Sequence, residues 1–549
     1  MTQTDQPVSN SPSLTPAARI VWLLLIVATL YFSYFHNLGA VGLVGPDEPR
    51  YAWIARDMAE TGDWVTPRLY GKPWFEKPVL YYWGAALSFK LFGVSDVTAR
   101  LPSALAALLA TMAIAWLALR LYGAETTRWV LLLLPPTVGM IGFSHAAATD
   151  MPFASMLTIA MVCGAVLLRL VPLDHRRSIS ALVAPLLFGF FLGLAVLAKG
   201  PAALILSGGA VLLWAVFTKR WRDAFRCFHP SAIFSFCVTA LPWYVICARR
   251  NPDFFRVFII EHNFKRYLTP EFQHIQPFWF YIPVTLIAFL PWAVLLLWAV
   301  ILGIQRIRNN ARPSHTTLLL LCWAGFCLFF FSTSKSKLPG YILPAIPAIG
   351  LLLARSYVVF SALNEKSLRW LLSIYAIGSL LAGIPLIAIG KISHVLIKPG
   401  PRELVAIGCV VLAFGLANLL LTLKTRTLPL SVLCVLPMIL LMVLFRPLSY
   451  PWLSRDPSRR TLAAELAAAR VPVDRIFAAN MKRGQLYSLS FYLHREVEAW
   501  TVDQNKTGYL LIPSRTCKEF TSAALTCADN PIELGRSGWF AYRLDAKAQ

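Results

Sequence analysis

Residues 97–121, VTARLPSALAALLATMAIAWLALRL, form the stretch that decides the class of fold. No charged side chain interrupts this stretch between Leu101 and Leu119, and about 20 apolar residues are enough for a helix to cross a bilayer. Similar stretches recur along the 549 residues of the chain, of which 57% are hydrophobic and only 14% are charged. The sequence therefore predicts an all-α polytopic membrane protein.

The hydropathy pattern predicts about thirteen membrane-spanning helices within a transmembrane domain at 20–445. Residues 1–19 are expected to form a cytoplasmic tail, and the first span a retained anchor, because no cleavage motif follows it. The turn at 199–201 could instead be a kink within one re-entrant hairpin. The predicted spans are 20–38, 97–121, 127–143, 152–170, 181–197, 202–217, 231–247, 277–304, 316–331, 341–360, 368–389, 403–423 and 428–445.

The formal net charge of the chain is +24. Anionic headgroups attract Lys and Arg, so we expect membrane lipids, and no nucleic acid, as partners. With the N-terminus in the cytoplasm, every inside loop is basic, as the positive-inside rule requires. The outside loops are also basic, but Asp, Glu, Trp and Tyr are interleaved there. That mixture favours binding of anionic ligands over ordinary headgroup anchoring.

The composition changes after residue 445, where several prolines mark a linker. Residues 446–549 mix an Ala-rich helical segment at 461–470 with short strand-like runs, which predicts a C-terminal α/β domain outside the membrane. Cys517 and Cys527 lie close together in this domain. We expect them to form a disulfide if the compartment is oxidising.

The long outside loop at 39–96 is the segment most typical of a functional site, because long ordered loops in compact proteins are often functional. Its prolines and aromatics suggest short helices along the membrane interface. Asp47 and Glu48 directly follow the first span, and Arg50 lies one helical turn beyond Asp47. Helix capping or interfacial solvation is the alternative explanation for these acids.

Two further segments contain candidate residues. Asp150 lies between two apolar stretches, where an acid is a site candidate by default, although it could also cap a helix that starts near Pro152. Lys335 and Lys337 lie in the Ser-rich turn at 332–341. Two ammonium groups and backbone N–H groups at a helix start suit a phosphate, whereas snorkelling to the headgroups is the alternative.

Five stretches resemble the lipid A aminoarabinose transferases, a family of the GT-C superfamily of glycosyltransferases. The resemblance covers essentially the whole chain, and its motifs are more specific for GT-C enzymes than for one sugar. The stretches are DEPRY at 47–51, GDWVTPR at 62–68, FEKP at 75–78, TDMP at 149–152 and SKSKLP at 334–339.

This resemblance implies a GT-C fold, a bacterial inner-membrane location and an active site that faces the periplasm. It implies an undecaprenyl-phosphate aminoarabinose donor, a lipid A phosphate as acceptor, and resistance to polymyxin. The enzyme is expected to be a monomer. The candidate catalytic residues are Asp47, Arg50, Lys77 and Asp150. The candidate substrate-binding residues are Tyr51, Tyr81, Tyr82, Arg266, Lys335, Lys337 and Tyr341.

No cofactor is certain, but Glu76 and His262 could meet at the mouth of the cavity and share a divalent cation, zinc or magnesium. Fixed cations could also stabilise the leaving phosphate without metal. Two alternatives remain open. One is a GT-C enzyme with another polyprenyl-phosphate sugar or a protein acceptor, similar to protein O-mannosyltransferases. The other is a flippase for lipid-linked sugars, for which the expected internal repeats are not evident.

Overall fold

The computed structural model describes residues 15–172, 179–269, 275–363, 458–501, 507–513, 525–527, 531–535 and 537–546, with scattered helical positions between 373 and 420. Within this part of the chain, six helices are long and apolar enough to cross a membrane, or seven if one bent pair counts as a span. The predicted helical membrane fold is therefore confirmed in kind. The total of thirteen spans is untested, because 368–389, 403–423 and 428–445 lie mainly outside the described residues.

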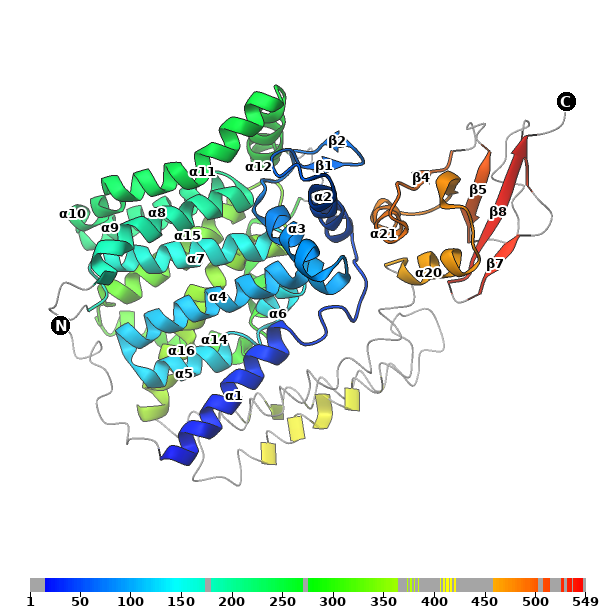
Figure 1. The fold of residues 1–549 in the computed structure, drawn as a ribbon. Coiled ribbons are helices and arrows are strands. Elements are labelled where there is room, and N and C mark those ends of the chain that lie inside the picture. Colours follow the sequence, from blue (N-terminus) through cyan, green and yellow to red (C-terminus); the bar gives the residue numbers. More distant parts are fainter. Residues whose placement is uncertain are drawn as a thin grey trace.

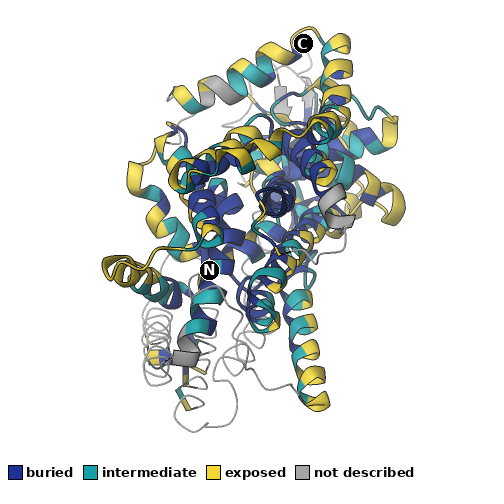
Figure 2. Ribbon diagram, turned by 90° about the vertical axis from the view of Figure 1, so that its left-hand side faces the viewer, coloured by how far each residue is buried: buried dark blue, intermediate teal, exposed yellow. Residues whose placement is uncertain are grey.

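The helices of the membrane part run side by side as a bundle around a common apolar core (Figure 1). The helix α7 lies at its centre and is buried along almost its whole length, whereas the outer helices expose apolar faces (Figure 2). Such outward-facing apolar surface is what lipid contact requires. The main helices are α1 (Pro16–Tyr34), α4 (Asp96–Tyr122), α7 (Asp150–Leu167), α8 (Ile179–Lys199), α9 (Ala202–Thr218), α11 (Pro230–Arg250), α15 (His315–Thr333) and α16 (Ile346–Leu363).

Two of the predicted spans are broken, and in both cases proline lies at the break. The predicted span 127–143 is divided into α5 (Ala124–Leu133) and α6 (Val138–Ser144), with Pro135 and Pro136 between them. Proline has no N–H to donate and its ring clashes with the preceding turn, so two successive prolines favour a break at this point. The predicted span 277–304 becomes three elements around Pro291. They are η3 (Phe278–Phe280), α13 (Tyr281–Ala288) and α14 (Ala293–Arg308), with a 120° bend before α14.

The first long loop folds into ordered elements, as the sequence suggests. It contains α2 (Asp47–Thr61), a two-stranded antiparallel pair of β1 (Arg68–Leu69) with β2 (Lys72–Pro73), and α3 (Leu80–Phe92). A glycine in the left-handed conformation, Gly62, ends α2, as glycine commonly does. A second apolar core beneath α2 joins this loop to the end of α11.

Smaller elements connect the helices of the bundle. They are α10 (Trp221–Ala224), η1 (Phe225–Phe228), η2 (Arg256–Lys265), α12 (Arg266–Leu268) and η4 (Pro339–Ala345).

The C-terminal unit is built on one mixed sheet in the order β4-β3-β5-β8-β6, with β7 also paired to β8. The pairs of β3 with β4 and with β5 are parallel, and β8 is antiparallel to its partners. The predicted Cys517–Cys527 disulfide cannot be followed, because Cys517 lies outside the described residues. The elements are α20 (Arg460–Ala468), η5 (Val473–Arg475), β3 (Ile476–Ala478), α21 (Arg483–Leu493), β4 (Glu498–Ala499), β5 (Gly508–Ile512), β6 (Leu525–Cys527), β7 (Ile532–Leu534) and β8 (Trp539–Ala546).

The C-terminal unit contacts the first loop through α21, which lies against α2 (Figure 1). The buried carboxylate of Asp96 accepts a hydrogen bond from the Tyr492 hydroxyl at 2.6 Å and pairs with Arg460 at 2.7 Å. The Tyr492 oxygen also accepts from the backbone N–H of Leu43 at 2.7 Å. These bonds join the sheet unit to the chain that leads into α2.

Candidate active site

A cluster of alternating charges lies at the start of α2. One guanidinium nitrogen of Arg50 is 2.6 Å from the Asp47 carboxylate and 2.9 Å from that of Glu76. Lys77 lies 3.6 Å from the other oxygen of Glu76. The side chain of Arg50 is only 6% exposed, whereas that of Asp47 is 52% exposed. The structure therefore brings four of the predicted residues together and leaves Asp47 as the most accessible of them.

The neighbouring acid, Glu48, belongs to a different group. Its two oxygens each accept a hydrogen bond from the Arg100 guanidinium, at 2.8 and 2.9 Å. They also accept from the backbone N–H groups of Val44 at 2.9 Å and Ala147 at 2.7 Å. Arg100 in turn donates to the carbonyls of Leu38, Val41 and Gly42. Glu48 thus holds the entry to α2 in place and has no free acceptor directed at a ligand.

A second charged pair borders the same space. Asp150 begins α7, and its carboxylate lies 2.5 Å from the ammonium of Lys199, the last residue of α8. The ammonium also lies 4.6 Å from the centre of the Tyr341 ring. The backbone comes so close that a Cβ at Gly340 would be 3.3 Å from Asp150 and 2.6 Å from the Phe143 ring. Asp150 and Tyr341 therefore meet as predicted candidates, with Lys199 between them.

Electrostatics link the two groups. Desolvation in this recess raises the pKa of the Asp47 carboxyl, while Arg50 lowers it. Glu76 and Asp150 raise the same pKa, and Lys77 lowers it. The start of α2 and the start of α7 are therefore near enough for the charges of Asp47 and Asp150 to interact.

Lys199 is the residue that sequence analysis missed. No sequence motif distinguishes it from the other basic residues of the outside loops. It could have been recognised as an isolated lysine at the end of a long apolar stretch. A charge within or beside a membrane span usually has a partner of opposite charge. Asp150, an isolated acid at the start of another apolar stretch, is that partner.

The aromatic candidates lie beneath the charges. Tyr51, Tyr81 and Tyr82 form one packed group with ring centres 5.8–6.2 Å apart, and all three are buried. The Tyr81 hydroxyl donates to the carbonyl of Ala99 at 2.8 Å. The guanidinium of Arg50 lies 5.1 Å from the Tyr51 ring and 5.1 Å from the Trp74 ring. In this conformation these tyrosines support Arg50, and their contact with substrate stays a prediction.

The turn at 332–341 separates its two lysines. Lys335 is exposed, and its backbone N–H donates to the carbonyl of Tyr267 at 3.0 Å, which places it beside α12. Lys337 is buried, and its ammonium donates to the carbonyls of Gln276 at 2.9 Å and Ser334 at 2.6 Å. Two of the three Lys337 donors are thus taken by the protein, and phosphate binding by the two lysines stays a prediction. The side chain of Arg266, in α12, lies outside the described residues.

The sharing of a metal by Glu76 and His262 stays a prediction. Glu76 is taken up by Arg50 and Lys77. Across the described ranges, no three His, Cys, Asp or Glu side chains come close enough together to hold an ion. Zinc sites in enzymes use three protein ligands, so Glu76 and His262 alone do not fit such a site.

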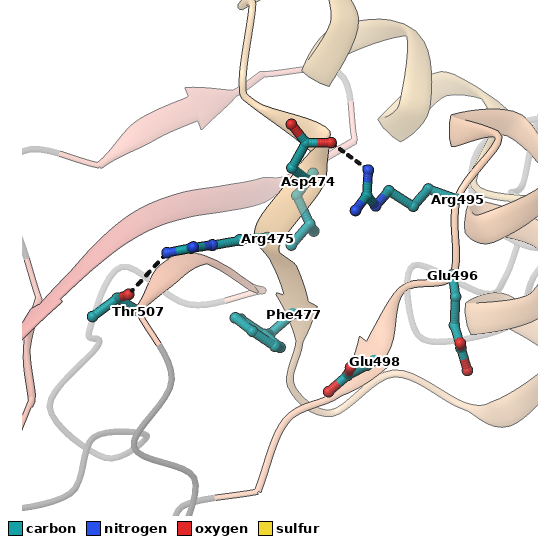
Figure 3. Close-up of a pocket in the computed structure, with 8 residues that line it drawn as sticks. Asp474, Arg475, Phe477, Arg495, Glu496, Glu498 and Thr507 are labelled. Atoms are coloured by element: carbon teal, nitrogen blue, oxygen red, sulfur yellow. Dashed lines mark hydrogen bonds and ion pairs between the residues drawn. The ribbon is translucent and has the colours of Figure 1, made fainter.

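A separate polar pocket lies in the C-terminal unit, at the amino ends of β3, β4 and β5 (Figure 3). Asp474 pairs there with Arg495, and Arg475 donates to Thr507. Both arginines thus have partners within the pocket. None of the predicted site residues lines it.

Comparison with known proteins decides the family. The undecaprenyl phosphate-alpha-4-amino-4-deoxy-L-arabinose arabinosyl transferase of Aeromonas salmonicida is 30% identical over 550 aligned residues, which cover 93% of this chain and 96% of the relative. The chain belongs to this arabinosyl transferase family. The Pseudomonas aeruginosa member is 32% identical over 408 residues, covering 73% of this chain and 71% of its own.

The fold of this arabinosyl transferase agrees with that assignment. A crystal structure of ArnT from Cupriavidus metallidurans bound to undecaprenyl phosphate superposes with a TM-score of 0.77 and covers 96% of this chain and 98% of its own, at 22% identity. The GT-C fold is thus shared. A family model described as dolichyl-phosphate-mannose-protein mannosyltransferase also matches residues 19–258.

Proposed function

We propose that this protein transfers 4-amino-4-deoxy-L-arabinose from undecaprenyl phosphate to a phosphate of lipid A, with inversion at the anomeric carbon. The observation that carries the proposal is the juxtaposition of Asp47, Arg50, Glu76 and Lys77 with Asp150 and Lys199. Its three cations and three carboxylates balance. Such a site suits a donor that itself carries both a phosphate charge and an ammonium group.

The negative charge of the leaving group indicates the role of the cations. When the bond between the sugar and the donor phosphate breaks, negative charge increases on that phosphate. Arg50 is held rigidly by two carboxylates and two aromatic rings, so it needs no rearrangement to stabilise this charge. Lys77 lies beside it, and the exposed Lys335 is the additional cation of the neighbouring turn.

The chemistry of the nucleophile and of the amino sugar indicates the roles of the carboxylates. A lipid A phosphate oxygen is anionic near neutral pH, so it needs no strong base to attack. Asp47 is the accessible carboxylate of the cluster and is the best placed to pair with the sugar ammonium or to orient the acceptor. Asp150 holds Lys199 and borders the same space. No step is assigned to a metal.

The finer topology belongs to the same proposal. The site is inferred to face the periplasm at the outer side of the inner membrane, because the loops of the opposite side are short and basic. Thirteen spans, a periplasmic C-terminal unit and a monomeric enzyme complete the arrangement. The family assignment of the whole chain, and the fold it shares with ArnT, support this reading.

A second candidate function, transfer to a protein hydroxyl, is favoured only by the mannosyltransferase family model over 19–258. A hydroxyl acceptor must lose a proton during attack, whereas a phosphate oxygen need not. The two readings therefore differ in the acceptor and in the need for a general base. Mass spectrometry of lipid A and of envelope proteins from cells with and without the gene separates them.

The proposal is tested with Asp47→Asn and Lys77→Ala in cells that make equal amounts of each variant. Loss of a fixed cation at a developing charge lowers turnover by about 100-fold or more, so aminoarabinose on lipid A and polymyxin resistance should disappear. Asp57→Asn, further along α2, is the matched control and should retain both. Lipid A modified to the wild-type level by both site variants would refute the assignment.

Selectivity for the amino sugar can be measured separately from the loss of transfer. Wild-type enzyme should transfer the amino sugar in strong preference to the same pentose without its amine. Asp47→Asn should reduce this preference while Lys77→Ala lowers transfer of both donors alike. Equal preference in wild type and Asp47→Asn would remove Asp47 from the recognition of the ammonium.

A further inference from the structure

An apolar groove runs along α9, from Leu204 to the segment that follows Ala215 at the end of the helix away from Lys199. It has a volume of about 590 Å³ and is lined by α8, α9, α10, η1 and α11. Pockets for small ligands typically have volumes of about 300–1,000 Å³. The only hydroxyl among its lining residues is that of Ser207, which donates to the carbonyl of Ala203 within its own helix. The other polar side-chain groups of this lining are the indole N–H of Trp221 and the thiol of Cys227, so the walls are almost entirely apolar.

The groove is open toward the surroundings of the bundle. Phe225 and Phe228, which close one end of it, are 66% and 68% exposed. Leu204, Leu212 and Ile233 along its walls are also exposed. In a membrane these side chains face lipid, and an apolar cavity of this size left empty would forfeit packing contacts. An acyl chain is the apolar molecule that the bilayer supplies.

Glycine leaves the space open at one point on the wall. A Cβ added at Gly208 of α9 would meet no atom within 4 Å, although Gly208 lines the groove. The adjacent Gly209 differs, because its Cβ would lie 2.1 Å from the ring of Phe326. A side chain can therefore be built into the groove at 208 without disturbing the packing of α9.

The mouth of the groove is strongly basic. The segment KRWRDAFR at 219–226 has four cations and one acid. Asp223 pairs with Arg220 at 2.7 Å and with Arg226 at 3.4 Å. Arg222 is exposed and has no acidic partner within the described part of the chain. Basic residues at the end of a groove between membrane helices suit an anionic headgroup.

We propose that this groove binds an anionic phospholipid, with one acyl chain between α9 and α11 and its phosphate at Arg222 and Arg226. The donor lipid is not the occupant. The 17 residues of α9 separate the basic segment from the end near Lys199, which amounts to about 25 Å at 1.5 Å per residue. A phosphate held at the charged site cannot also reach Arg222 (Figure 1). The proposal does not depend on the reaction catalysed.

The test uses full-length protein, stripped of lipid in detergent and titrated with phosphatidylglycerol or with phosphatidylcholine of the same chains. Bound lipid is counted by native mass spectrometry. We expect wild type to bind phosphatidylglycerol about tenfold more tightly than phosphatidylcholine, since a basic residue near a lipid phosphate contributes about 1 kcal/mol. Arg222→Ala with Arg226→Ala should abolish the preference. Gly208→Leu should weaken binding of both lipids.

Two matched controls accompany these variants. Arg306→Ala with Arg308→Ala removes two exposed cations from the end of α14, and Gly303→Leu adds the same side chain where a Cβ also meets nothing within 4 Å. Both should bind phosphatidylglycerol as wild type does. Equal binding of the two lipids by wild type, unchanged binding by the groove variants, or displacement of phosphatidylglycerol by a polyprenyl phosphate would each overturn the proposal.

A measurement on wild type alone covers the case in which a variant does not fold. Phosphatidylglycerol with a photoactivatable group in one chain is cross-linked to the protein, and the labelled peptides are identified. We expect label within 204–236, in α9, η1 and α11. Label spread evenly over exposed helices such as α14 would show that this surface is only solvated by lipid, and the proposal would fail.

Discussion

Two adjacent carboxylates at the start of α2 have different surroundings and different uses. Consecutive residues of a helix point about 100° apart, since the helix has 3.6 residues per turn. Asp47 therefore faces the recess with Arg50, whereas Glu48 points inward to Arg100 and two backbone N–H groups. The sequence DE does not show which of the two remains available to a ligand.

The accessible acid leads to a prediction about pH. Partial desolvation within the recess raises the pKa of Asp47, although about half of its side chain is exposed, so its charge is lost at a higher pH than that of an ordinary aspartate. If the ionised form is needed, kcat/KM should fall as pH decreases through this raised pKa. Asp47→Asn should give low activity without that acid limb. A pH series of the purified enzyme measures both, and an acid limb that persists in Asp47→Asn would assign it to another group.

The same pKa shift indicates that Asp47→Asn should fold. A carboxyl whose pKa is raised by folding is less favourable when ionised in the folded state than in the unfolded chain, so near neutral pH its charge does not contribute to stability. Replacing it with a neutral isostere removes that penalty. Loss of transfer by this variant can thus be attributed to the site.

At the scale of elements, the ion pair between α2 and α4 is the interaction that orients the site. Arg100 of α4 joins Glu48 of α2 to three carbonyls of the segment between α1 and α2. All of these groups are buried or half-buried, and each has a partner. The direction in which α2 leaves the membrane part follows from this network.

Breaking that pair should destabilise the protein strongly. Arg100→Met leaves the carboxylate of Glu48 buried without its cation, which typically costs about 3–5 kcal/mol. We expect a clear decrease in the melting temperature in detergent, partly restored by adding Glu48→Gln. Arg68→Met removes a 3.7 Å surface pair with Asp63 and an exposed 3.3 Å hydrogen bond to the Gly71 carbonyl, and it should change stability by less than about 1 kcal/mol. Equal melting temperatures for Arg100→Met and wild type would contradict this role.

At the scale of the whole molecule, one carboxylate at the end of the first loop binds the C-terminal unit. Asp96 begins α4, and its carboxylate pairs with Arg460 and accepts a hydrogen bond from Tyr492, both in the C-terminal unit. Burial raises the pKa of the Tyr492 hydroxyl well above its usual range, with the Asp96 charge acting in the same direction. This hydroxyl therefore stays protonated and donates to Asp96.

This contact should determine how firmly the C-terminal unit holds the entry to α2. Tyr492→Phe leaves the N–H of Leu43 without its acceptor and removes one donor from Asp96, a loss of about 1–3 kcal/mol. Hydrogen exchange should become faster over 39–61, and transfer should decrease while the sheet unit remains folded. Tyr509→Phe in β5 is the control and should leave exchange in that loop unchanged. Unaltered exchange in Tyr492→Phe would show that the two units are independent.

The sequence by itself determined the helical membrane class, the ordered first loop and the acid and lysine candidates, because hydrophobic runs and isolated charges are local signals. It also indicated the family, through short motifs whose residues do meet: Asp47, Arg50, Glu76 and Lys77 lie together. The breaks at Pro135 and Pro291 were visible as prolines. Whether a proline kinks a span or ends it, however, depends on what packs around it.

Only the tertiary structure decided which polar groups remain free for chemistry. Lys337 is used by two carbonyls, Glu48 by Arg100, and Lys199 acquires Asp150 from another helix. Apart from the bond of Lys337 to the nearby Ser334, each of these pairings joins residues from segments that lie apart along the chain. The free energy of a buried charge depends on the partner that the fold brings to it, and no local pattern of residues contains that partner.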